Sequence, residues 1–207
     1  MKVREALLGL GFAALFAVPA SAEVIFAGPS GPQATDSSIT VTFNSGAATT
    51  ADLSFTVDGY LTLDGVNTYE DDFALSLNGT PIFSGTFNLG GGSNTTQAVV
   101  FLNPYGATFS NPTNNGTGVG RHGGQEIISF GDVLPLLAGT NTLVFSYTSL
   151  PRPGHYGFQG LSDEGWGIQN VTTSIPEPST WAMMLLSFAS LGFAGYRSTR
   201  KSTSATA

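Results

Sequence analysis

Carboxylate-rich stretches are the part of this sequence whose residue types point most directly to chemistry. Carboxylate and amide oxygens are the ligands that Ca²⁺ prefers in proteins. The residues that could supply them are Asp64, Asn67, Glu70, Asp71, Asp72, Asp163 and Glu164. The first group is not an EF-hand loop, since the glycine at the sixth position is missing. Two interpretations stay open: a structural Ca²⁺ at one of the two groups, or solvated loop carboxylates that keep an acidic protein soluble.

Sequence patterns of catalysis and zinc binding are missing. The chain has no cysteine, and its two histidines, His122 and His155, stand beside glycine rather than in a His-Glu-x-x-His run. The glycines at Gly160 and Gly165 flank a serine with the wrong spacing for a nucleophile elbow. A general acid and base could still meet in space from distant carboxylates. We therefore expect a protein that is not an enzyme, with a secreted glycan hydrolase as the minor alternative.

Five aromatic residues are candidates for stacking on sugar rings: Tyr60, Tyr69, Tyr105, Tyr156 and Trp166. Tyr105, Tyr156 and Trp166 are the ones we expect to contact a glycan. Trp166 falls in an expected strand, where a large aromatic side chain more often packs in the core. Tyr105 and Tyr156 lie in Gly/Pro-rich segments, so both exposure and burial stay open for them.

The charge of the central part excludes one class of partner. Twelve of the 14 acidic residues and only two basic residues, Arg121 and Arg152, lie between Glu23 and Ser174, which gives this part a net charge of −10. Such a surface repels phosphate backbones, so we expect no nucleic-acid binding. Because the chain has no cysteine, its stability must come from a packed core rather than from disulfides.

Apolar and polar residues alternate with period two, which is typical of half-buried strands. Clear examples are 39–43, 53–57 and 73–77, and the Asn78-Gly79 pair predicts a tight type I′ hairpin turn. Pro81, just after that turn, indicates an edge strand or a bulge. Further strands are expected at 83–87, 98–102, 125–130, 142–147 and 166–172.

These short strands, joined by Gly, Asn, Ser and Pro, predict an all-β fold: an antiparallel two-sheet sandwich of the jelly-roll type over residues 23–174. No long amphipathic helix interrupts the pattern. The Asn/Gly-rich stretch from Asn103 to Gly124 is expected to be a surface loop.

The amino-terminal residues 1–22 have the organisation of a secretory signal peptide. Lys2 and Arg4 precede an apolar stretch at 6–18, and Ala20-Ser21-Ala22 supplies the small residues that signal peptidase requires. We therefore expect an exported protein whose mature chain begins at Glu23. A permanent amino-terminal anchor is the alternative, although the apolar stretch is short.

The carboxyl-terminal segment combines a chain-breaking motif, an uncharged stretch and a basic cluster. Pro176, Glu177 and Pro178 end any preceding strand. Residues 179–196 carry no charge and are just long enough for a transmembrane helix, about 27 Å. Basic residues at 197–201 follow and would stay in the cytoplasm, before a polar tail at 202–207. The alternative is a buried helix of a soluble domain.

Residues 175–201 resemble the PEP-CTERM sorting signal of Gram-negative bacteria that make exopolysaccharide. The resemblance implies that an exosortase recognises Pro176-Glu177-Pro178 and removes the helix. It also implies an inner-membrane intermediate, held by that helix, before delivery to the cell surface or the extracellular space. The chain departs from the family pattern because its basic residues are spread out and followed by a tail, which bears on how efficiently the signal is processed.

A more diffuse resemblance covers most of residues 23–174. Stretches such as 71–79, 137–145 and 163–171 are similar to the jelly-roll bodies of galactose-binding-like domains. The resemblance implies the fold but does not establish sugar binding. Besides the export machinery, signal peptidase and exosortase, the expected partner is exopolysaccharide. The chain is thus interpreted as an exported structural or polysaccharide-associated protein, with a carbohydrate-binding module as the alternative.

Overall fold

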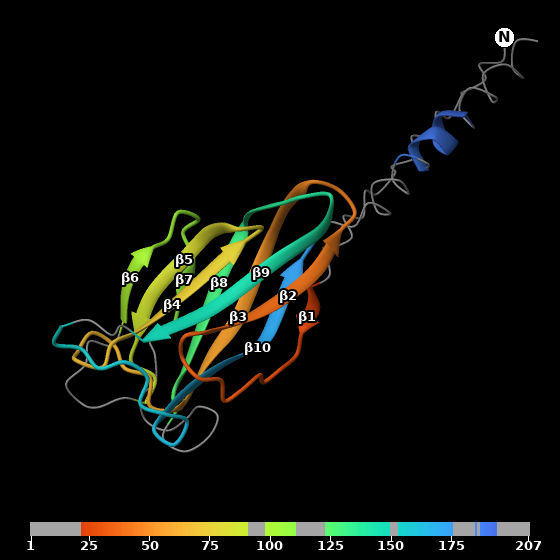
Figure 1. Cartoon of the computed structure of the whole chain (residues 1–207). Coiled ribbons are helices and arrows are strands. Elements are labelled where there is room, and N and C mark those ends of the chain that lie inside the picture. The colour runs from red at the N-terminus through yellow and green to blue at the C-terminus, as the bar shows by residue number, and fades with distance from the viewer. Residues whose placement is uncertain are drawn as a thin grey trace, which may run out of the picture.

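The computed structural model describes residues 22–90, 98–110, 123–149, 153–175, 185 and 187–193. Within these residues the chain forms β-strands in two layers that pack face to face (Figure 1). The strands are β1 (Ala22–Phe26), β2 (Ser37–Ser45), β3 (Thr49–Leu61), β4 (Asp71–Leu77), β5 (Thr80–Phe87), β6 (Ala98–Leu102), β7 (Thr108–Phe109), β8 (Gln125–Leu136), β9 (Gly139–Ser149) and β10 (Glu164–Ser174).

The strands form two five-stranded sheets. Sheet A has the order β1-β10-β3-β8-β7, and sheet B has the order β2-β9-β4-β5-β6. Every neighbouring pair of strands is antiparallel. The expected all-β antiparallel two-sheet sandwich is therefore confirmed, and its form is consistent with a jelly-roll-like body.

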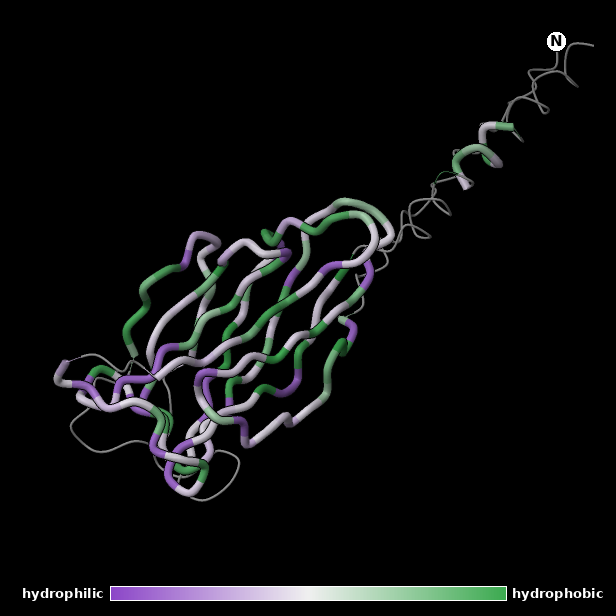
Figure 2. The backbone as a smooth tube through the Cα atoms, viewed as in Figure 1, coloured by the Kyte–Doolittle hydropathy of each residue, from purple (hydrophilic) through white to green (hydrophobic). Residues whose placement is uncertain are grey.

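Because side chains alternate along each strand, every second side chain points into the space between the two sheets, and these side chains are mostly apolar. Figure 2 shows this as hydrophobic and polar residues that follow one another along the strands. In β4, Phe73, Leu75 and Leu77 are buried while the side chains between them are partly exposed. The ring of Phe73 lies 5.9 Å from that of Phe55 on the opposite sheet, measured between centroids. The core is therefore built from facing aromatic residues.

Each of the eight expected strands lies within an observed one, from β2 to β6 and from β8 to β10. The hairpin turn is also confirmed, because Asn78 and Gly79 have φ angles of 51° and 79°. The register shifts between Leu75 and Ser76, which is the bulge that Pro81 indicated. Strands β1 and β7 were not predicted from the sequence. Residues 103–124 are thus not wholly a loop, since Thr108 and Phe109 pair with β8.

The two expected terminal helices lie largely outside the described residues. The signal peptide falls there except for Ala22, which is the first residue of β1. Of the expected transmembrane helix, Leu185 and residues 187–193 are described as helical. Within the described part of the chain, we find no helix with the length and hydropathy needed to cross a membrane.

The amino-terminal segment lies along β10 well beyond β1. The backbone N–H of Asn170 donates to the carbonyl oxygen of Ala27 at 2.9 Å, and that of Ser30 donates to Ile168 at 2.9 Å. Farther along, Gln33 and Trp166 exchange two backbone hydrogen bonds. Strand β10 is therefore enclosed between β3 and the amino-terminal residues of the same chain.

This contact requires a glycine at position 167. A Cβ atom added to Gly167 would lie 1.8 Å from the carbonyl oxygen of Ser30, which is a backbone atom and cannot rotate away. We expect Gly167→Ala to lower the free energy of unfolding by roughly 1–3 kcal/mol. Urea denaturation measures this change. Gly131→Ala is the matched control, since nothing lies within 4 Å of its added Cβ. Equal urea midpoints for the two variants would contradict the packing of Ser30 on β10.

Candidate functional site

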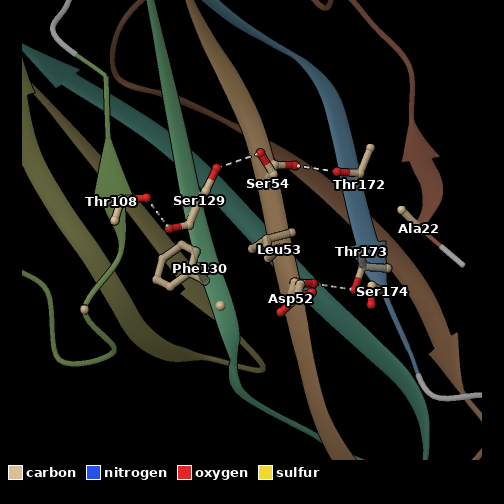
Figure 3. A pocket seen from close by; sticks show the side chains of 12 residues that line it. Ala22, Asp52, Leu53, Ser54, Thr108, Ser129, Phe130, Thr172, Thr173 and Ser174 are labelled. Atoms are coloured by element: carbon tan, nitrogen blue, oxygen red, sulfur yellow. Dashed lines mark hydrogen bonds between the residues drawn. The ribbon is translucent and has the colours of Figure 1, made fainter. Parts of the chain in front are cut away.

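A groove of about 540 Å³ crosses the outer face of sheet A (Figure 3). All five strands of the sheet contribute to it. The residues that line it are Ala22, Asp52, Leu53, Ser54, Gly106, Thr108, Ser129, Phe130, Gly131, Thr172, Thr173 and Ser174. Most of its polar side chains are hydroxyls, and Asp52 is the ionisable side chain among the lining residues.

The alternation of side chains along the strands explains why hydroxyls line this face. Leu53 and Phe55 point into the core and are almost fully buried, so Ser54 between them points outward. The strand register then aligns the hydroxyls of neighbouring strands, because Ser54 is paired with Ser129 on one side and with Thr172 on the other. Adjacent strands lie about 4.8 Å apart, so the hydroxyls form a row across the sheet.

Hydrogen bonds hold this row in place. The hydroxyl oxygens of Ser54 and Ser129 lie 2.9 Å apart, and Thr108 Oγ1 donates to the carbonyl oxygen of Ser129 at 3.3 Å. Thr172 Oγ1 donates in the same way to Ser54 at 3.4 Å. Each hydroxyl keeps further capacity to accept a hydrogen bond. The groove is thus suited to bind a neutral ligand that carries several hydroxyls.

Trp166 does not belong to this or any other surface site. Its side chain is fully buried, and its indole Nε1 donates to the carbonyl oxygen of Ala34 at 2.9 Å. Its ring lies 5.7 Å from that of Tyr147. The interpretation of Trp166 as a glycan contact is corrected: the period-two pattern places this side chain on the inner face of β10, where no ligand reaches it.

The two tyrosine candidates differ in exposure. Tyr105 is half-buried and packs against the core next to the groove residue Gly106. Tyr156 is 61% exposed, and its ring stacks on that of Tyr69 with centroids 5.0 Å apart. A backbone hydrogen bond of 2.7 Å from Tyr156 to Thr68 joins their two loops. This aromatic pair lies at the end of the sandwich opposite Ser174, so the structure does not bring the candidates together.

The groove was not predicted from the sequence, because isolated hydroxyl residues form no motif. Ser54, Ser129 and Thr172 come from three expected strands that are far apart in the chain. The available signal was that one outward position of each strand is a hydroxyl residue. Without the order of the strands in the sheet, nothing indicates that these positions lie side by side.

The candidate Ca²⁺ ligands lie together at the end of the sandwich opposite the groove, but they are used within the protein. Asp71 accepts a hydrogen bond from Ser149 Oγ at 2.6 Å through one carboxylate oxygen and one from the backbone of Asp64 at 3.1 Å through the other. Asn67 donates to Asp64 Oδ1 at 2.9 Å. Glu164 Oε1 accepts from the backbone N–H of Gln159 at 2.6 Å.

The remaining candidates complete this placement. Glu70 is buried, and its backbone forms an isolated β-bridge with that of Asp64. Asp72 is half-buried in β4, and Asp163 is exposed just before β10. Across the described residues, no three His, Cys, Asp or Glu side chains are grouped so that they could hold a metal ion. Hydrogen bonds within and between loops take up both carboxylate oxygens of Asp71 and one oxygen each of Asp64 and Glu164, so these three residues are engaged within the protein.

Burial changes the protonation of three of the carboxyl groups at this end. It raises the pKa of Asp71 to about 8, although the hydrogen bond from Ser149 opposes the shift. It also raises the pKa of Glu126 to about 8, against the hydrogen bonds from Ser110, and that of Glu164 to about 7. One oxygen of Glu126 has no hydrogen-bond partner among the described residues. Asp71 and Glu126 are therefore mostly protonated at pH 7, and Glu164 is partly protonated.

Comparison with known proteins identifies one segment. The PEP-CTERM protein-sorting motif matches residues 174–201, and the match begins at the last residue of β10. The processing residues Pro176, Glu177 and Pro178 lie in this match. They lie outside the described residues, and so does the signal-peptide residue Ala20 at the other end of the chain. No curated protein and no solved structure matches the chain. The motif implies exosortase-type sorting of an exported protein destined for the cell surface of a Gram-negative bacterium.

The buried carboxyl groups predict that the protein is more stable in mild acid. A carboxyl group with a raised pKa in the folded state holds a proton that the unfolded state has lost. Stability therefore falls as the pH rises from about 4 to about 8. We expect a higher Tm at pH 5 than at pH 8. Glu126→Gln should raise the stability at pH 8 by roughly 1–3 kcal/mol and change it little at pH 5.

Thermal melts across this pH range measure both effects, and each kcal/mol corresponds to about 2–4 °C in Tm for a domain of this size. Asp132→Asn is the matched control, because it removes an exposed carboxyl group from the same strand, β8. A Tm that rises toward pH 8, or an equal slope in wild type and Glu126→Gln, would show that burial does not protonate these groups.

Proposed function

We propose that this exported protein works at the cell surface or in the extracellular matrix, in a structural or exopolysaccharide-associated role. The observation that carries the proposal is the position of the sorting motif, which begins where β10 ends. All ten described strands lie between Ala22 and Ser174. Removal of both terminal signals therefore takes only one strand residue from the sandwich, Ala22 of β1. The body is thus a complete folded unit that the two signals deliver.

The groove supports association with a neutral polysaccharide. Its row of hydroxyls offers hydrogen bonds to sugar hydroxyls, and the net charge of −10 on residues 23–174 disfavours a polymer that is itself anionic. A non-enzymatic role is part of the same proposal. Glycoside hydrolysis uses two carboxyl groups on either side of the bond that breaks, whereas Asp52 is the one carboxylate among the groove's lining residues.

A second candidate function is that of a carbohydrate-binding module with an aromatic contact. The observation that favours it is the exposed Tyr69–Tyr156 pair, since aromatic faces pack on sugar rings. The two tyrosines lie in loops outside sheet A, whereas the groove is lined by the strands of that sheet, so variants at one position can be compared with variants at the other.

Export and sorting predict a shortened mature protein. We expect the species recovered from the native cell envelope to begin at Glu23 and to end between residues 175 and 180. Intact mass and cell fractionation together measure this. A recovered species that retains residues 181–197 would identify the carboxyl-terminal segment as a permanent anchor and would contradict exosortase-type processing.

Polysaccharide association predicts weak retention that depends little on salt. We expect the body to be retained on immobilised native exopolysaccharide and Ser129→Leu to weaken this about tenfold, equivalent to about 1.4 kcal/mol, by removing a central hydroxyl and filling the groove. Ser38→Leu is the matched control, because Ser38 is an exposed residue of β2 in the other sheet. Tyr156→Ala tests the aromatic alternative.

Three outcomes are informative in that experiment. A loss of retention with Tyr156→Ala alone would favour the carbohydrate-binding module. Absence of retention in the wild type would leave a purely structural role. Retention that weakens steeply with salt would show that charged groups, not hydroxyls, make the contact.

A further inference from the structure

Three of the four strands at the edges of the two sheets carry features that oppose pairing with a further strand. An edge strand exposes backbone N–H and C=O groups, and natural proteins shorten, bend or charge such edges. Strand β7 has two residues. The register of β1 with β10 and that of β6 with β5 each shift once, and β1 also carries Glu23. These three edges are therefore poor templates for another strand.

Strand β2, at the remaining edge, has none of these features (Figure 1). It pairs with β9 in one uninterrupted register over all nine of its residues, and β9 is its one partner among the described strands. No charged residue and no proline occurs in its sequence, Ser-Ser-Ile-Thr-Val-Thr-Phe-Asn-Ser. At about 3.4 Å per residue, the strand offers a regular edge about 31 Å long.

The hydrogen bonds of β9 show where the backbone groups of β2 point. Thr142 accepts a bond from the backbone N–H of Asn78 at 2.8 Å, and its own N–H donates to Asn78 Oδ1 at 2.9 Å, so both groups face the β4 side. Thr142 lies opposite Thr42 of β2. Opposite residues of an antiparallel pair exchange either both backbone bonds or neither. The N–H and C=O of Thr42 therefore point away from β9, toward the edge.

This direction repeats at every second residue of a strand. Ser38, Thr40 and Asn44 thus present their backbone groups to the edge together with Thr42. The side chains of all four residues are exposed on the outer face of sheet B. The strand therefore offers a row of N–H donors and C=O acceptors that β9 does not use.

The sequence of β2 is also complementary to itself. When two copies of the strand run antiparallel about Val41, Thr40 lies opposite Thr42 and Ile39 lies opposite Phe43. Hydroxyl residues thus meet hydroxyl residues on the outer face, and apolar residues meet apolar residues on the inner face. Such cross-strand pairs stabilise an antiparallel sheet.

From these observations we infer that β2 is a self-association site, where two copies of this protein pair edge to edge about a two-fold axis at Val41. Thr40 of one copy and Thr42 of the other exchange two backbone hydrogen bonds, and so do Ser38 and Asn44. The symmetry repeats both pairs, which gives about eight bonds and joins the two sheets B into one continuous sheet. The inference goes beyond the proposed function, since it needs no ligand in the groove.

The charge of the protein favours a second copy at this edge. Residues 23–174 carry a net charge of −10, so two copies repel each other wherever acidic residues face one another. Strand β2 has no charged residue, and neither has its neighbour β9. Pairing through β2 therefore brings uncharged strands together.

The extent of the contact predicts a weak, closed dimer. Backbone hydrogen bonds supply the affinity when a strand is added to a sheet edge. A contact through one strand lies at the small end of specific interfaces, so we expect a dissociation constant on the order of 100 µM. The same strand is used by both copies, so the assembly closes at two.

The pairing fixes how the two grooves are directed. Opposite residues of an antiparallel pair point to the same face of the sheet, so the inner faces of the two sheets B lie on one side. Sheet A of each copy then lies on that side as well. Both grooves open in the same direction, and a dimer offers two of them to one surface.

The test uses the mature protein isolated from cells that export it, in the absence of polysaccharide. Sedimentation equilibrium between about 10 and about 500 µM should show a monomer–dimer equilibrium. Thr42→Pro should raise the dissociation constant at least tenfold, because it removes an edge N–H that β9 does not use. Thr42→Val is the matched control, since it keeps both the branched shape and the N–H, and should dimerise like the wild type. Urea midpoints verify that both variants are folded.

Amide exchange in the wild-type protein locates the contact without any substitution. The amides of Thr40 and Thr42 should exchange about threefold more slowly at about 500 µM than at about 10 µM, since most chains are then paired. The amides of Val41 and Phe43 point toward β9, and their exchange should not depend on concentration. NMR measures both sets.

Four results would overturn the inference. The wild type could remain monomeric at 500 µM, or a folded Thr42→Pro variant could dimerise as well as Thr42→Val. A series of larger species would show that the contact does not close at two. Exchange at Thr40 and Thr42 that ignores concentration would place any dimer contact elsewhere. Loss of polysaccharide retention has no bearing on these measurements, so failure of the proposed function stays distinguishable.

Discussion

The pairing of β10 with two partners is the constraint on which the sandwich depends. On one side β10 pairs with β3 through the centre of sheet A, and on the other it pairs with β1 and with the backbone of residues 27–33. The inner face of the same strand supplies Trp166 and Ile168, which are fully buried. Sheet A is therefore complete only when the first strand of the body has paired with the last one. The packing of the amino-terminal segment and the position of both chain ends follow from this one strand.

Alternating hydrophobicity predicted most of the fold, and local turn chemistry predicted the β4–β5 hairpin. The two missed strands show where such reasoning ends. Residues 22–26 form an edge strand with little burial, so their sequence carries no strong alternation and reads as the end of the signal peptide. Strand β7 is two residues long and lies in an Asn/Gly/Pro-rich stretch. Each depends on a neighbour from a distant part of the chain.

The candidate site was harder to predict because it depends on strand order. The hydroxyls of Ser54, Ser129 and Thr172 become neighbours only when β3 lies between β8 and β10. For the carboxylates that are close in sequence, the sequence left open whether they bind Ca²⁺ or are solvated loop residues, because the partners of each carboxyl group depend on the fold. Asp71 turns toward Ser149 and the backbone of Asp64, so its oxygens stabilise the loop rather than a cation. The sorting motif was predictable because it is continuous in sequence and needs no fold to be recognised.

The burial of Trp166 has a practical consequence for following this protein. The chain contains two tryptophans, and the other, Trp181, belongs to the segment that matches the sorting motif. A body separated from that segment thus carries one indole, enclosed by the core and in ring contact with Tyr147. Its fluorescence emission is blue-shifted while the two sheets are packed and moves to longer wavelength when water reaches the core. With excitation selective for tryptophan, a single indole then reports the folding of the exported body without any added label.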